Sequence, residues 1–181
     1  NDELLEILSE TKDPLRVQPH LKKCFEAINS LDFNDDLIIS AMFSAEGERV
    51  PWIRTLAPAE ANGAVEKWLL QTESLMIESM RDQIARAIEA YTPETREQWV
   101  IDWPGQVVLG IGQLYWTKEF EDAVSSKGPA GVKEYVEKLN SQLDQIVQMV
   151  RGDLSKSART TLGALVTLDV HSRDVTAVLA A

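Results

Sequence analysis

Residues 132–150, VKEYVEKLNSQLDQIVQMV, carry the clearest structural pattern in the sequence. Their apolar side chains recur at intervals of 4, 3, 4, 3 and 4, at Val132, Val136, Leu139, Leu143, Ile146 and Val150. This spacing aligns them on one side of an α-helix, as an apolar seam that needs a parallel or antiparallel helical partner. The stretch therefore predicts a long helix packed in a bundle, which Gly152 interrupts.

Further long helices are predicted on both sides of this seam. From residue 62, apolar residues recur at helical spacing to Tyr91, which predicts one helix of about 29 residues, or roughly 43 Å. Residues 106–124 are apolar nearly all round in their first half, which is typical of a central helix, and we expect Gly110 and Gly112 to permit close helix packing there. Residues 154–179 predict the last helix.

Breaker residues separate these predicted helices. Thr92-Pro93 should end the first long helix and start a short one, because Thr caps helices and Pro suits the first helical position. Trp103-Pro104-Gly105 predicts the next break, and residues 125–131 predict a loop.

The N-terminal quarter predicts shorter elements. Asn1 can cap a helix over residues 2–8, and a second helix should follow Pro19. Its apolar face would hold Leu21, Cys24, Phe25, Ile28 and Leu31.

The pattern then changes to alternation over residues 37–44, which favours a β-strand. Glu46-Gly47-Glu48 supplies a turn, residues 49–53 can return as a partner strand, and Pro51 indicates that this partner lies at a sheet edge. The predicted fold is mostly α: a bundle of long helices forming an elongated rod, with one small β-hairpin near residues 37–54. We expect two parts, residues 1–56 with the hairpin and residues 57–181 with the long-helix bundle.

Charge limits the classes of partner. Lys and Arg number 18 against 29 Asp and Glu, a net charge of −11 at pH 7, so we expect neither nucleic acid nor an anionic membrane to bind directly. The single Cys excludes a disulfide framework within the chain. The first residues, Asn1-Asp2-Glu3, have neither an initiator Met nor a signal region, which suggests an intracellular protein and a piece of a longer chain.

Motifs for catalysis or cofactor binding are weak. No GxxxxGK[ST] string is present, and Gly110-Ile111-Gly112 has Tyr115 where a dinucleotide fingerprint needs its third glycine. His20 and Cys24 have a possible metal-ligand spacing, but we interpret them as a surface His and a buried Cys. We therefore predict no catalytic, cofactor-binding or metal site.

Three other groups of residues admit a functional interpretation beside a structural one. An acid/base role is conceivable for the acidic residues Glu94, Glu97 and Asp102, but solvated helix faces explain them. A structural polar cluster is favoured over a catalytic base for Asp169, His171 and Asp174, with Arg173. Core packing is the default for the tryptophans, with contact to a neighbouring domain as the alternative, at Trp52, Trp68, Trp99, Trp103 and Trp116.

Several strings resemble the linker region of dynein heavy chains, particularly the axonemal ones. They extend in order over essentially the whole chain: NDELLEIL from Asn1, VQPHLKKCF from Val17, SAEGE from Ser44, VEKWL from Val65, WPGQVVL from Trp103, LGALV from Leu162 and DVHSRDV from Asp169. The WPGQ and LGALV strings look most like those of single-headed inner-arm axonemal dyneins.

The resemblance implies a non-catalytic segment of a motor linker, the lever that swings over a ring of AAA+ modules and couples ATP turnover to microtubule-based movement. It implies that residues 57–181 end before the first AAA+ module, that ATP and Mg belong to the parent ring, and that this ring and the dynein tail with its associated chains are the partners. The expected location is the cytoskeleton of the ciliary or flagellar axoneme, on the cytoplasmic side, without direct microtubule binding by this segment.

Two other functions remain open at this point. A helical adaptor could bind a partner helix or filament through the seam of residues 132–150, and a small helical enzyme is a third interpretation. For a lever, bending should concentrate at a break between helices, and Thr92-Pro93, Trp103-Pro104-Gly105 and residues 125–131 are the candidate joints.

Overall fold

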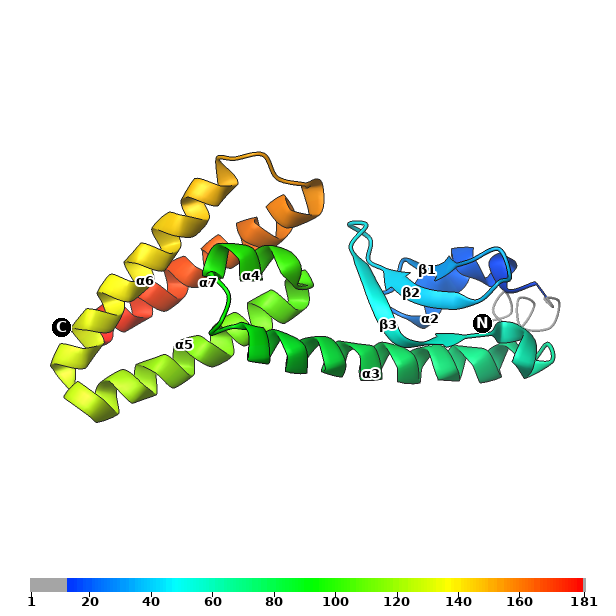
Figure 1. Cartoon of the computed structure of the whole chain (residues 1–181), viewed down its shortest axis with the longest axis horizontal. Helices are drawn as coiled ribbons and strands as arrows, with labels where there is room; N and C mark the ends of the chain where they lie inside the picture. Colours follow the sequence, from blue (N-terminus) through cyan, green and yellow to red (C-terminus); the bar gives the residue numbers. More distant parts are fainter. Residues whose placement is uncertain (1–12, 181) are drawn as a thin grey trace. The chain divides into compact units, whose positions relative to one another are not determined.

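The computed structural model describes residues 13–180, which form six α-helices, two 3₁₀ helices and one three-stranded antiparallel sheet (Figure 1). The predicted fold class, mostly α with a small β element, is confirmed. The chain divides into two compact units, residues 1–82 and 83–181. The predicted helix over residues 2–8 lies outside the described residues.

The first unit is built around the sheet, whose strand order is β1–β2–β3. β2 (Ile39–Phe43) and β3 (Arg49–Leu56) form the predicted hairpin. Ser44 Oγ closes its turn by accepting hydrogen bonds from the N–H groups of Glu46 and Glu48. β3 is an edge strand, as Pro51 predicts, and a proline there costs no ladder hydrogen bond.

The third strand, β1 (Ser30–Phe33), lies in a segment whose pattern predicts a helix, and that prediction is wrong. After the 3₁₀ helix η1 (Pro14–His20), helix α2 covers only Leu21–Cys24. The Gln18 side chain accepts from the Leu31 N–H and donates to the Leu31 carbonyl, both at 2.9 Å. Leu31 also pairs with Met42 of β2. Leu31 is thus buried within a paired strand, and Ile28 is buried in the irregular segment that precedes this strand.

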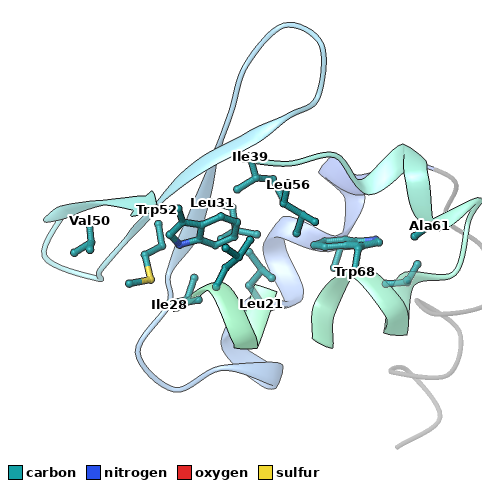
Figure 2. Packing of buried hydrophobic residues seen from close by; sticks show 13 residues of the cluster. Leu21, Ile28, Leu31, Ile39, Val50, Trp52, Leu56, Ala61 and Trp68 are labelled. Carbon is teal, nitrogen blue, oxygen red and sulfur yellow. The ribbon is translucent and has the colours of Figure 1, made fainter. Parts of the chain in front are cut away.

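The core of this unit joins the sheet to the short helices and to the start of α3 (Val65–Ala90) (Figure 2). Trp52 of β3 and Trp68 of α3 are buried with Leu21 and Leu31, while η2 (Pro58–Ala61) leads from the sheet into α3. Burying such large apolar side chains supplies the main stabilisation of a unit this small.

The second unit consists of the end of α3 and four further helices: α4 (Arg96–Asp102), α5 (Gly105–Lys127), α6 (Pro129–Val150) and α7 (Lys156–Leu179). α5, α6 and α7 pack on one another. The seam is confirmed as a packing face, because its members Val132, Leu139 and Ile146 are buried. None of the described helices is both long and apolar enough to cross a membrane.

Two predicted boundaries in this unit are wrong. Residues 125–131 are not a loop: α5 and α6 are separated by Gly128 alone, whose φ of 56° and ψ of −137° suit glycine, and Pro129 starts α6. The short helix after α3 begins at Arg96 and not at Thr92-Pro93. Thr95 is its cap, with Oγ1 accepting from the Gln98 N–H at 3.3 Å.

Candidate functional site

An open pocket of about 270 Å³ lies within the second unit, and we call it the Tyr91 pocket. Its lining comes from the α3–α4 turn, from α4 and from single turns of α5 and α6: Tyr91, Thr92, Glu94, Arg96, Trp99, Glu119, Lys138 and Gln142. The pocket therefore marks the place where four consecutive segments of the second unit meet.

Aromatic rings form one wall of the Tyr91 pocket. Tyr91 stacks on Tyr115 of α5, with ring centroids 3.7 Å apart and an interplanar angle of 6°, and meets Trp99 of α4 edge to face at 5.0 Å. Trp99 Nε1 donates to the carbonyl of Ala87 at 2.8 Å, and the Tyr115 hydroxyl donates to the carbonyl of Ile88 at 3.4 Å. These contacts hold the last turn of α3 against α4 and α5.

An ion pair with little exposure ties α4 to α7. Arg96 Nη2 lies 2.7 Å from Asp169 Oδ2, and the two side chains are only 12% and 16% exposed. Burial raises the pKa of the Asp169 carboxyl, and the Arg96 guanidinium offsets that rise only in part. Burying these two charges costs free energy, so the pair fixes the position of α4 on α7 more than it stabilises the fold.

A second group of polar contacts ties α5 to α6. Lys138 Nζ lies 2.8 Å from Glu119 Oε2. The Tyr135 hydroxyl donates to the carbonyl of Trp116 at 3.3 Å. Burial, and then the nearby Glu119 carboxylate, raise the pKa of Tyr135, so this phenol stays a neutral hydrogen-bond donor.

Two polar atoms beside the pocket, Glu94 Oε2 and Arg96 Nε, are buried and have no hydrogen-bond partner in the structure. Both atoms are closed to solvent, so a molecule entering the pocket would meet other atoms first. The cations that do reach the pocket, Arg96 and Lys138, already hold Asp169 and Glu119. The arrangement is suited to fixing helices together.

The structure separates most of the residues that the sequence suggested as candidates. Asp169 pairs with Arg96, whereas Arg173 donates to Asp174 at 2.6 Å and to Asn140 at 3.1 Å. His171 is exposed. The polar residues near the end of α7 therefore do not form one cluster.

The other candidates are also dispersed. Cys24 is exposed, so its predicted burial is wrong. Residues 13–180 contain no group of three or more His, Cys, Asp or Glu side chains placed to hold a metal ion. Of the acidic candidates, Asp102 is exposed and accepts from Gln98 Nε2 at 2.7 Å, and Glu94 alone lines the Tyr91 pocket.

The tryptophans follow the core-packing interpretation in most cases. Trp52, Trp68 and Trp99 are buried. Trp116 is half-buried and its Nε1 donates to Thr176 Oγ1 of α7 at 3.0 Å, and the half-buried Trp103 ring lies 5.6 Å from the Arg86 guanidinium carbon.

Comparison with known proteins finds similarity to dynein heavy chains. Residues 1–87 match the model of the dynein heavy chain, N-terminal region 2. Residues 1–87 are therefore similar in sequence to this region of dynein heavy chains. Dynein axonemal heavy chain 12 of Homo sapiens is 59% identical over 97% of the chain and 6% of its own length.

Two further dyneins extend the comparison. Dynein axonemal heavy chain 3 of Homo sapiens is 55% identical over 99% of the chain, and dynein axonemal heavy chain 1 of Mus musculus is 47% identical over 97%. The chain spans only 4% of the length of each of these two relatives. The similarity to axonemal dynein heavy chains therefore covers both units of the structure.

Proposed function

We propose that this chain is a segment of the linker of an inner-arm axonemal dynein heavy chain, where it acts as a non-catalytic mechanical lever. The lever swings over the AAA+ ring of the same polypeptide and couples ATP turnover to microtubule-based movement. The observation that carries this proposal is the identity of 59% to dynein axonemal heavy chain 12, which runs through 97% of the chain.

The packing of the second unit suits a lever. α5, α6 and α7 pack on one another. The Arg96–Asp169 pair joins α4 to α7, which are distant in sequence, and the Lys138–Glu119 pair joins the consecutive helices α5 and α6. Dense interhelical packing resists deformation, because protein interiors are packed as closely as organic crystals and therefore transmit strain. The proposal includes a division of the chain into residues 1–56 and 57–181. It also includes a joint between helices, at Thr92-Pro93, at Trp103-Pro104-Gly105 or within residues 125–131.

The proposal includes partners and location. ATP and Mg are bound by the parent ring, the ring and the tail with its associated chains are the partners, and the motor works in the ciliary axoneme. The adaptor function is less favoured, because Val132, Leu139 and Ile146 of the seam are already buried in the second unit, where α6 packs on α5 and α7.

The test uses the full heavy chain and separates ATP turnover from movement. Arg96→Ala should loosen α4 from α7, so microtubule gliding velocity should fall severalfold while basal ATP turnover stays within about twofold. Arg151→Ala, in the α6–α7 connection, is the matched control and should leave both rates unchanged. Loss of ATP turnover in proportion to velocity would contradict a lever role, as would an unchanged velocity in a folded Arg96→Ala motor.

A further inference from the structure

Thr92-Pro93, one of the candidate joints, is also a candidate site of covalent modification. It is the sole Ser-Pro or Thr-Pro dipeptide in the sequence. Thr92 is exposed in the turn between the end of α3 at Ala90 and the start of α4 at Arg96. Its hydroxyl makes no hydrogen bond to any described residue, so it is accessible as an acceptor of a chemical group.

The neighbours of Thr92 suit an added phosphate. Lys138, Arg96 and Gln142 line the same pocket and offer hydrogen-bond donors, and two of them are cations. Arg96 is nearly buried and holds Asp169, but the Lys138 side chain is 49% exposed and holds Glu119 in a pair that solvent can reach. Lys138 is therefore the cation that is free to change partners.

We propose that Thr92 is the phosphorylation site of a proline-directed protein kinase and that Lys138 binds the phosphate. The Thr92 hydroxyl oxygen forms a bond to the γ-phosphorus of ATP, the bond from that phosphorus to the β-phosphate oxygen breaks, and the hydroxyl proton passes to the kinase base. The products are phosphothreonine and ADP. This inference is independent of the proposed lever function.

The phosphate changes the contacts of the Tyr91 pocket. It brings a charge of about −1.5 to −2 at pH 7 next to Glu94 and Glu119, which repel it, and next to Lys138, which attracts it. Lys138 then exchanges the Glu119 carboxylate for the phosphate, because the phosphate carries more charge and more acceptor oxygens. Phosphorylation thereby removes one tie between α5 and α6.

The first experiment treats the folded 181-residue chain with a proline-directed kinase and Mg-ATP, and locates the phosphate by mass spectrometry. One phosphate on Thr92 is expected, with complete loss in Thr92→Ala and at least a tenfold slower rate in Pro93→Ala, which keeps the hydroxyl. Phosphorylation of the urea-unfolded chain but not of the folded chain would overturn the proposal. So would equal rates for the wild type and Pro93→Ala.

The second experiment measures the phosphate pKa by ³¹P NMR. Lys138 should lower the second pKa of phosphothreonine, ordinarily about 6, by roughly half a unit, and Lys138→Gln should abolish that shift. Lys133→Gln removes an exposed lysine elsewhere on α6 and is the matched control, in which the shift should persist. Equal pKa values in the wild type and Lys138→Gln, or loss of the shift in both variants, would overturn the assignment of Lys138.

Discussion

Gly131 occupies a position where no side chain fits. A Cβ there would lie 2.3 Å from the carbonyl oxygen of Ala123 and 3.0 Å from Lys127 Cβ, both in α5. Because one of these atoms belongs to the backbone, a rotamer change cannot relieve the clash. The first turn of α6 therefore depends on glycine for its approach to the last turns of α5.

This gives a prediction for two glycines in helices. Gly131→Ala should lower the free energy of unfolding by about 2–3 kcal/mol, because α5 and α6 must separate. Gly110→Ala is the matched control. The close helix packing predicted at Gly110 is wrong, because nothing lies within 4 Å of an added Cβ there, so this substitution should raise stability by about 0.5–1 kcal/mol. Urea unfolding followed by circular dichroism measures both changes, and equal effects of the two variants would contradict the predicted close approach.

Asp169 predicts a pH dependence of stability. Its pKa is raised above 3.8 by burial, so between 3.8 and the folded-state pKa the folded chain keeps a proton that the unfolded chain has released. The stability from that proton is complete below pH 3.8 and is lost as the pH rises through the folded-state pKa.

The comparison that isolates this carboxyl is with Asp169→Asn. The unfolding free energy of the wild type minus that of Asp169→Asn should fall as the pH rises from about 3 and level off near neutral pH. Urea titrations across this range measure the difference. A difference that grows with pH would mean that the attraction of Arg96 outweighs the burial of Asp169.

At the scale of elements, α3 and the edge strand β3 are joined by a hydrogen bond. The N–H of Ile53 donates to Ser79 Oγ at 3.1 Å, and Ser79 is fully buried. Beside it, the Arg54 guanidinium pairs with the Glu78 carboxylate. α3 thus satisfies a backbone donor on the open side of β3, which protects this sheet edge.

Ser79→Ala should therefore cost about 1–2 kcal/mol of unfolding free energy, because it leaves the Ile53 N–H without its acceptor. It should also speed hydrogen exchange at that amide, which NMR measures. Ser74→Ala is the control on the same helix, since exposed Ser74 only donates back to the carbonyl of Leu70, and its effect should stay within about 0.5 kcal/mol. Unchanged exchange at Ile53 in Ser79→Ala would argue against the role of this hydrogen bond.

The sequence was most informative where local periodicity and packing agree. The seam of residues 132–150 predicts α6 because its period matches both the helix and the partner faces. The same reasoning failed at Ile28 and Leu31, whose apolar spacing fits a helix. The Gln18 side chain and β2 instead pair with Leu31 as part of a strand, and Ile28 lies in the irregular segment before it. The composition of residues 125–131 predicts a loop, but it does not show that Gly128 alone is enough for the turn between α5 and α6.

The sequence alone does not predict the Tyr91 pocket. Arg96 and Asp169 are 73 positions apart, and the pairing depends on how α4 and α7 pack. Tyr91 and Tyr115 stand on separate segments, and only their aromatic character gave any signal. The sequence predicts Thr92-Pro93 as a helix breaker, whereas only the fold shows that Thr92 and Lys138 line the same pocket.

At the scale of the whole molecule, the net charge of −11 governs association with polyanions. We predict that the isolated chain does not co-sediment with microtubules at physiological salt, because the microtubule lattice is also acidic and like charges repel. Lowering the salt lengthens the range of this repulsion and should not promote binding. Clear pelleting at either salt concentration would contradict the prediction.

Gly128 has a consequence for how this chain can evolve. Only one residue separates α5 from α6, so no loop can absorb an inserted amino acid. The insertion would extend one helix and rotate the residues that follow by about 100° around the helix axis. Val132, Leu139 and Ile146 would then point away from their neighbours. Related chains should consequently vary in length at the α6–α7 connection and keep a constant residue count across Gly128.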